Sequence, residues 1–93
     1  MKIYISGKIT GIEKEAIAIF EKAEKELLVA GYEVVNPMKL NHDHDKSWAS
    51  YMKVCIKALC DCDAIYLLHN WQDSDGANIE FGIALKLRLK IIR

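Results

Sequence analysis

The segment DSDGANIE, residues 73–80, contains the side chains of this sequence that are best suited to chemistry. It leads from a polar loop into an expected helix, and the free N–H groups at a helix start favour an anion. Ser74 adds a hydroxyl there, and Glu80 follows within the first turns, on one face with Ala77 and Ala84. Small alanines beside a carboxylate leave space for a ligand, so we single out Glu80 as the key carboxylate. A surface glutamate on an ordinary helix is the alternative that this spacing leaves open.

A second polar segment follows the first expected strand, where Gly7 and Gly11 bracket Lys8 and Thr10. Glycines allow the backbone to approach a ligand closely, and a helix begins soon after this loop. The spacing matches neither the GxGxxG dinucleotide motif nor the P-loop. From the spacing alone, contact with a ligand and a tight turn between strand and helix fit this segment equally well.

The two tryptophans could stack on a base, because an aromatic face accepts any base. Trp48 fits the apolar stripe of an expected helix, so we assign it to the core. Trp71 lies in the loop beyond the third expected strand, where we expect it to contact a ligand or an interface.

Two further segments contain metal-ligating residue types, namely NHDHD at residues 41–45 and the pair Cys60 and Cys62. Alternating loop residues need a further partner to converge on one ion, and none is obvious here. We therefore expect a solvated loop at 41–45, which could close over a ligand, and the end of a helix at the cysteines. The sequence predicts neither a metal nor a cofactor.

The elements that must position these residues alternate between strand and helix. We expect them at residues 2–6, 13–30, 32–35, 47–61, 64–68, 76–88 and 89–92, beginning and ending with a strand. Such alternation predicts an α/β fold, a small doubly wound, flavodoxin- or Rossmann-like parallel sheet of about four strands with flanking helices. Ligands of such sheets bind beyond the carboxyl ends of the strands, where the strand order switches. This rule selects the loops at 6–12, 36–46 and 69–76.

Length and composition restrict the class of protein. The 93 residues, 52% of them hydrophobic, fit a single domain spanning 1–93, and a domain this small favours a homo-oligomer, a dimer or larger. Equal numbers of acidic and basic residues, 13 each, argue against a nucleic-acid partner held by phosphate neutralisation. The 3 cysteines show no disulfide framework, and neither a signal-peptide pattern nor a long apolar run is present. We therefore expect a cytoplasmic protein with no membrane partner.

Four strings spread over nearly the whole chain form a pattern. They are KIYISGKITG at the start, NP at 36–37, WxxYM from Trp48, and CDAIYLLxxWxxSxGAxxExxxA from Cys62. The pattern resembles the nucleoside 2-deoxyribosyltransferase-like superfamily, and within it a family of short phage and bacterial proteins. The last string is fairly specific and the first is moderately so. The fold that the superfamily implies is the doubly wound α/β domain described above.

The resemblance implies cleavage of the N-glycosidic bond of 2′-deoxynucleosides or of their 5′-monophosphates. Glu80, in the SxGxxxE part of the last string, would be the nucleophile at the anomeric carbon of the sugar. A covalent glycosyl-enzyme would form and then pass the sugar to water or to another base, as in retaining glycosidases.

The same resemblance implies which residues bind the substrate. Tyr4 and Gly7 match positions that line the sugar site. In hydrolase relatives that act on monophosphates, a serine six residues before the glutamate contacts phosphate, and Ser74 has that spacing. Lys8 and Thr10 follow the first glycine, where such relatives place phosphate contacts. The expected substrate-binding residues are Tyr4, Gly7, Lys8, Thr10, Trp71, Ser74 and Gly76.

The sequence departs from the superfamily at Cys55. Relatives carry an aspartate there, eight residues before the aspartate that opens the third strand, which is Asp63 in this chain. A thiol, with an ordinary pKa near ~8.5, cannot replace a carboxylate in orienting a sugar hydroxyl at neutral pH. Cys55 also fits the apolar stripe of its helix. A second carboxylate could come from a loop, from Asp43, Asp45, Asp73 or Asp75.

Three functions are compatible with these features. The first is an N-glycosidase or transferase that uses Glu80. The second is a binding module with the same pocket and weak or lost catalysis, which would sequester or sense a nucleotide-derived metabolite; Cys55 favours it. The third is a small scaffold protein whose pocket is vestigial.

Overall fold

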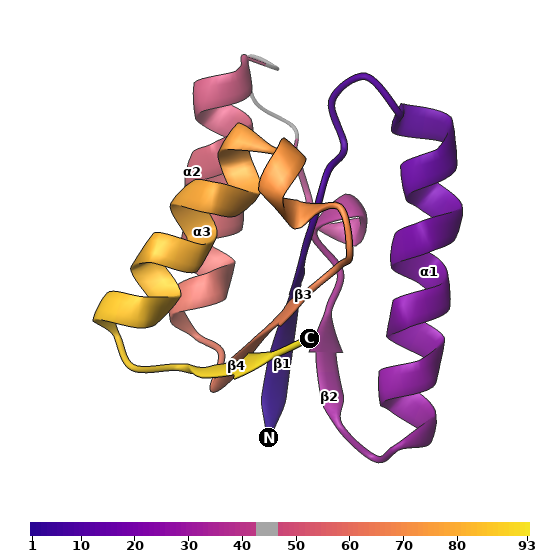
Figure 1. The fold of residues 1–93 in the computed structure, drawn as a ribbon, viewed down its shortest axis with the longest axis vertical. Coiled ribbons are helices and arrows are strands. Elements are labelled where there is room, and N and C mark those ends of the chain that lie inside the picture. Colours follow the sequence, from indigo (N-terminus) through magenta and orange to yellow (C-terminus); the bar gives the residue numbers. More distant parts are fainter. Residues whose placement is uncertain (43–46) are drawn as a thin grey trace.

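The computed structural model describes residues 1–42 and 47–93, and shows a parallel sheet flanked by helices (Figure 1). In chain order the elements are β1 (Lys2–Ser6), α1 (Glu13–Val29), β2 (Glu33–Val35), η1 (Pro37–Lys39), α2 (Trp48–Cys60), β3 (Ala64–Leu67), η2 (Trp71–Asp73), α3 (Asp75–Lys86) and β4 (Lys90–Ile92). The strands form a four-stranded sheet in the order β2-β1-β3-β4, and every neighbouring pair is parallel. The predicted doubly wound α/β fold is thus confirmed.

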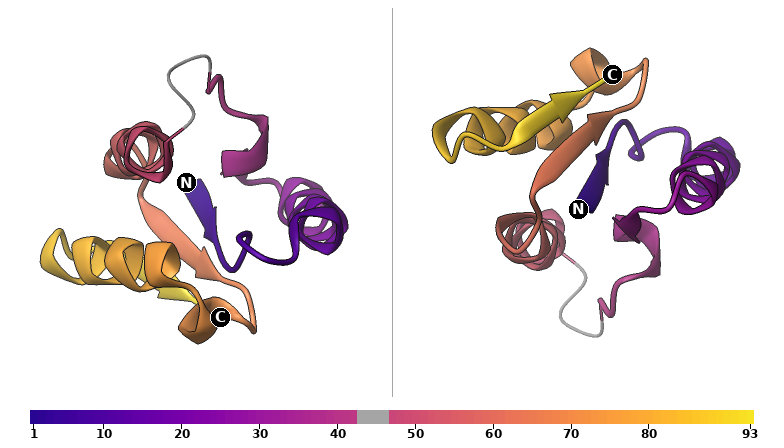
Figure 2. Two further views of the ribbon diagram at one scale, coloured as in Figure 1. Left: turned by 90° about the horizontal axis from the view of Figure 1, so that it is seen from above. Right: turned by 90° about the horizontal axis from the view of Figure 1, so that it is seen from below.

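The helices cover the two faces of the sheet unequally. Helix α1 lies on one face, whereas α2 and α3 lie on the other (Figure 2). Successive strand residues point to opposite faces, so Ile3 and Ile5 of β1 pack with Phe20 of α1, while Tyr4 packs with Cys55 of α2 and Ala84 of α3. The central strand is therefore buried on both sides.

The switch in strand order lies between β1 and β3, because the chain leaves β1 toward β2 and later returns to the other side of β1. Ser6 pairs with Leu67 at the carboxyl ends of these two strands. The loops that follow them therefore emerge side by side at the edge where doubly wound sheets bind ligands.

Two serines cap the starts of helices. The Ser47 hydroxyl accepts a hydrogen bond from the backbone N–H of Ser50 at the start of α2, and the Ser74 hydroxyl accepts one from that of Ala77 at the start of α3. Such caps satisfy N–H groups that a helix start otherwise leaves without an intrahelical partner. The predicted element ends lie within two residues of the observed ones, and those of the first strand coincide with them. None of the helices in the described ranges has both the length and the apolar character needed to traverse a bilayer.

Candidate functional site

Glu80 lies at the centre of a buried polar cluster. Its side chain projects from α3 toward β1, and the residue is only 5% exposed. The Tyr4 hydroxyl donates a hydrogen bond to Glu80 Oε2 at 2.6 Å, and the Ser6 hydroxyl donates one to Oε1 at 2.7 Å. Each carboxylate oxygen is thus held by one hydroxyl, and each keeps a further lone pair for another partner.

The periodicities of one strand and one helix produce this cluster. Tyr4 and Ser6 are two residues apart in β1, so both side chains point to the face that α3 covers. Glu80 shares the buried face of α3 with Ala77 and Ala84. Because these alanines are small, the helix packs closely on the sheet and brings the carboxylate within reach of the two hydroxyls.

Burial dominates the electrostatics of Glu80. Desolvation raises the pKa of its carboxyl group to about 7, although the hydrogen bonds from Tyr4 and Ser6 favour the charged form and lower the pKa in part. No salt bridge to Glu80 is formed by the residues of the ranges 1–42 and 47–93. A buried carboxylate that is held by neutral hydroxyls and faces a cavity is a candidate functional group, because structural carboxylates are normally neutralised by a cation.

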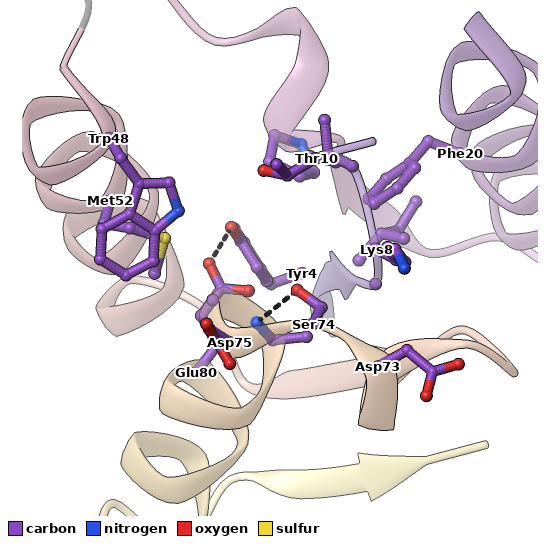
Figure 3. A pocket seen from close by; sticks show the side chains of 16 residues that line it. Tyr4, Lys8, Thr10, Phe20, Trp48, Met52, Asp73, Ser74, Asp75 and Glu80 are labelled. Carbon is purple, nitrogen blue, oxygen red and sulfur yellow. Dashed lines mark hydrogen bonds between the residues drawn. The ribbon is translucent and has the colours of Figure 1, made fainter. Parts of the chain in front are cut away.

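A cavity of about 440 Å³ opens next to this carboxylate (Figure 3). This volume lies within the range of small-molecule sites. The wall includes Tyr4, Gly7, Lys8, Thr10, Ser74, Gly76 and Glu80, together with Ile5, Ile9, Phe20, Pro37, Trp48, Met52, Asp73, Asp75 and Ala77. We refer to it as the Glu80 cavity. Of the residues that the sequence singled out for catalysis or substrate binding, all but Trp71 line it.

Gly7 is required where the loops after β1 and β3 meet. A Cβ at this position would lie 2.6 Å from Leu68 Cδ1 and 2.9 Å from Leu68 Cβ, which is too close for any side chain. The next backbone N–H, that of Lys8, donates to the side-chain oxygen of Asn70 at 3.0 Å. This contact fixes the first loop against the third, so the turn is both tight and part of the cavity wall.

Trp71 lies elsewhere, contrary to its grouping with the substrate-binding residues. It is absent from the described residues that line the Glu80 cavity. Its ring packs against Phe81, with centroids 4.7 Å apart, and the Arg93 guanidinium lies 5.9 Å from the centre of the Trp71 ring. The short helical turn η2 directs the indole away from the cavity, toward a groove beside α1 that includes His69.

Trp48 lies at the surface, so the prediction that it belongs to the core is wrong. It is 51% exposed and lines the Glu80 cavity. Trp48 is the first residue of α2, and the described residues leave half of its surface exposed, whereas Cys55 farther along the same stripe packs in the core against the sheet. Figure 3 shows its indole on the α2 side of the cavity, across from Thr10.

Ser6 is the functional candidate that the sequence reasoning missed. It is completely buried and binds Glu80 directly, yet it was assigned only to the end of a strand. Its position two residues after Tyr4 was the available signal, since alternate residues of a strand share a face.

Cys55 occupies the position where an acidic group would be expected, and its surroundings keep it neutral. The residue is 1% exposed, and burial raises the pKa of its thiol to about 11, with the Tyr4 and Tyr51 hydroxyls opposing this shift in part. At neutral pH the side chain is therefore an uncharged thiol packed in the core. The expectation of a small hydrophobic role is confirmed.

The other candidate ligands of a metal do not form a centre. Within residues 1–42 and 47–93, no group of three or more His, Cys, Asp or Glu side chains could hold an ion. Residues 43–46 of the NHDHD string, including Asp43 and Asp45, lie outside the described residues. His42 stacks on Tyr51, with ring centroids 4.3 Å apart. Cys62 is a free thiol that donates to the carbonyl of Ala58, as expected for the end of a helix.

Fold and site together define a class: a small doubly wound parallel α/β domain with a buried carboxylate in a cavity at the carboxyl edge of its sheet. Comparison with known families then places the chain. It belongs to the family described as a domain of unknown function (DUF4406), which matches residues 1–93. A search of the curated proteins finds no match.

Proposed function

We propose that this protein cleaves the N-glycosidic bond of 2′-deoxynucleosides or of their 5′-monophosphates, with Glu80 as the nucleophile. The observation that carries the proposal is the carboxylate itself, which is buried, has no cationic partner among the described residues, and is held by two hydroxyls beside a cavity of about 440 Å³. The resemblance of the SxGxxxE string to the nucleoside 2-deoxyribosyltransferase-like superfamily supports the same assignment.

The proposed reaction begins with attack by a Glu80 oxygen on the anomeric carbon. The new C–O bond forms as the C–N bond breaks, and the bonding pair leaves with the base, which takes a proton from solvent. In the second step, water or another base attacks the anomeric carbon, the C–O bond to Glu80 breaks with its electron pair returning to the carboxylate, and the attacking group gives a proton to solvent. Positive charge develops on the sugar in each step, and a buried carboxylate beside the anomeric carbon stabilises that charge.

The two hydroxyls give this carboxylate a defined orientation. Tyr4 and Ser6 each occupy one lone pair of a Glu80 oxygen, so the remaining lone pairs point in fixed directions. Such preorganisation lowers the barrier because the nucleophile need not be reoriented at the moment of reaction. The exposed indole of Trp48 borders the same cavity and offers a face on which the base could stack.

The experiment that tests this proposal is incubation with a panel of 2′-deoxynucleosides and their monophosphates, with free base followed by chromatography. We expect base release by the wild-type protein and its loss, by at least about a hundredfold, in Glu80→Gln. The matched control is Glu33→Gln, an exposed glutamate of β2 that does not line the cavity. If Glu80→Gln still releases base at the wild-type rate, Glu80 is not the nucleophile.

Cys55 favours a second candidate, a module that binds the same class of ligand without turning it over. Its buried, neutral thiol cannot orient a sugar hydroxyl as an aspartate would. Thermal stabilisation by a nucleoside or nucleotide, without any release of base, would support binding alone. If Cys55→Asp gains glycosidase activity, the cysteine at this position is the reason why the wild-type protein does not turn its ligand over.

A further inference from the structure

The groove beside α1 is a second cavity, with a volume of about 490 Å³. Helix α1 is the one α-helix of the described residues on its face of the sheet, whereas α2 and α3 share the other face (Figure 2). Because α1 lies beside β2 (Figure 1), the part of this face that β3 and β4 form is more open, and Tyr66 of β3 is only half-buried there. Trp71 contributes to the wall, so we refer to this cavity as the Trp71 groove.

Most of the wall of the Trp71 groove is apolar. It includes Ile19 and Ala23 of α1 and Leu68 after β3, together with the rings of Tyr66 and Trp71. A flat ring system fits such a wall, because aromatic rings pack well against other rings and bury a large apolar surface. The volume of about 490 Å³ lies within the range of small-molecule sites.

The polar groups of the Trp71 groove are mostly hydrogen-bond donors. The Lys22 ammonium and the Arg93 guanidinium can only donate. The Tyr66 hydroxyl and the Trp71 indole N–H are two further donors, and neither makes a hydrogen bond in the part of the chain that the structure describes. Glu26 is the one carboxylate side chain among the described lining residues. The wall therefore offers a ligand more donors than acceptors.

The two cations of the groove have no carboxylate partner. Lys22 and Glu26 lie one turn apart on α1, yet no salt bridge joins them within residues 1–42 and 47–93, and none joins Arg93 to a carboxylate side chain there. The Arg93 guanidinium instead lies 5.9 Å from the centre of the Trp71 ring, within the range of cation–π attraction. Both cations are exposed, so an anionic ligand can reach them without breaking an ion pair.

We propose that the Trp71 groove binds a small organic anion, a flat apolar ring system that carries a carboxylate. The ring would lie against the apolar wall, and the carboxylate would accept charge-assisted hydrogen bonds from Lys22 and Arg93. His69, at the same groove, can add a further donor. The groove shares no described lining residue with the Glu80 cavity, so this site is separate and does not depend on the proposed function.

The two tryptophans can report on the two cavities separately. Trp71 borders the groove and Trp48 borders the Glu80 cavity, so the NMR signal of each indole N–H shows which cavity a ligand enters. Trp48→Phe removes one of the two signals and thereby assigns both. The probes are a naphthalene carboxylate and the corresponding carboxamide, which share the flat ring and differ in charge.

We expect the carboxylate to shift the Trp71 signal saturably and to leave the Trp48 signal in place. At about 20 mM salt its dissociation constant should be about fivefold lower than that of the carboxamide, because two exposed cations each contribute a modest attraction. At about 500 mM salt the two dissociation constants should approach each other, since exposed charges are screened.

Variants of the two cations test whether the charge acts at the groove. Lys22→Gln and Arg93→Gln should each raise the dissociation constant of the carboxylate about twofold at low salt, and that of the carboxamide should not change. The matched control is Lys14→Gln, an exposed lysine of α1 that does not line the groove and whose loss should have no effect.

Three results would overturn the proposal. The first is a Trp71 signal that the carboxylate leaves in place, and the second is a shift of the Trp48 signal alone, which would put the probe in the Glu80 cavity. The third is equal binding of the two probes by the wild-type protein at low salt, a comparison that needs no variant. None of these results bears on the release of base, so this proposal and the proposed function fail independently.

Discussion

Glu80 and Glu24 are two glutamates in two opposite environments. Glu24, on α1, pairs with Lys39 of η1 at 2.7 Å and accepts a weaker hydrogen bond from the Asn36 amide at 3.3 Å. The hydrogen bond from Lys39 is the largest cause of a pKa below the ordinary value for the Glu24 carboxyl group. Glu80 also accepts two hydrogen bonds, but both donors are neutral hydroxyls and burial raises its pKa to about 7.

The difference shows that the number of hydrogen bonds does not decide the role of a carboxylate. Glu24 lies near the surface beside the Lys39 ammonium, which stabilises its charge. The ion pair links α1 to η1. The charge of Glu80 is costly in the folded protein because the side chain is buried without a cation among the described residues, which makes Glu80 a candidate functional group.

The largest expected effect is on the pH dependence of the free energy of unfolding, which should differ between the wild-type protein and Glu80→Gln. The folded-state pKa of Glu80, about 7, lies above its ordinary value of 4.5, so the free energy of unfolding should fall as pH rises from about 4.5 to about 7, by at most about 3 kcal/mol. Glu80→Gln should remove this fall, because an amide can bond both hydroxyls without ionising. Urea denaturation of the wild-type protein and of Glu80→Gln at pH 5 and pH 8 measures this fall. If the free energy of unfolding changes equally with pH in the two proteins, the prediction is contradicted.

A smaller effect should follow from removing one donor to Glu80. A hydrogen bond to a charged group contributes about 1.5–3 kcal/mol, so Ser6→Ala and Tyr4→Phe should each raise the pKa of Glu80 by about one unit or more. The shift of the carboxyl carbon of Glu80 in an NMR titration reports this pKa directly. Tyr66→Phe is the matched control, since Tyr66 lies on the other face of the sheet. An unchanged pKa in Ser6→Ala would mean that this hydroxyl does not control the charge.

The smallest effect should come from Glu24, and its pH dependence should have the opposite sign. Because the folded-state pKa of Glu24 is lowered, its contribution is present above the ordinary pKa of 4.5 and is lost as pH falls through the folded value. Lys39 is 56% exposed, so Glu24→Gln should cost less than about 1 kcal/mol at pH 7. Denaturation at pH 7 and pH 3 checks this, and a variant that is more stable than wild type at pH 7 would break the comparison.

The sequence predicted the fold well because the signals for it are local and repeated. Alternating apolar strands and helices, Gly31 after α1, and the serine caps of α2 and α3 lie within a few residues of the elements that they define. The parallel pairing follows from the alternation itself. The ends of the elements are predicted less exactly than their types, because they depend on where packing against the sheet stops.

The site was predicted less completely because its parts meet only in three dimensions. The strings single out Glu80 and Tyr4, but Ser6 meets Glu80 only through a contact between residues 74 positions apart in the chain. Trp48 follows the periodicity of a core residue, and no local pattern shows that half of its surface is exposed. Trp71 does not line the Glu80 cavity, because η2 directs its ring toward the groove beside α1, and its contact with a ligand or an interface stays a prediction. Homo-oligomerisation stays a prediction, which sedimentation would test.

The measurement that tests the central claim most directly is mass spectrometry of the protein during incubation with a 2′-deoxynucleoside, stopped rapidly with acid. If Glu80 is the nucleophile, a fraction of the protein gains the mass of one deoxyribosyl unit, and digestion assigns it to the peptide that contains Glu80. The adduct should be absent in Glu80→Gln. Release of base with no adduct on that peptide at any time, or an adduct on another residue, would contradict the account.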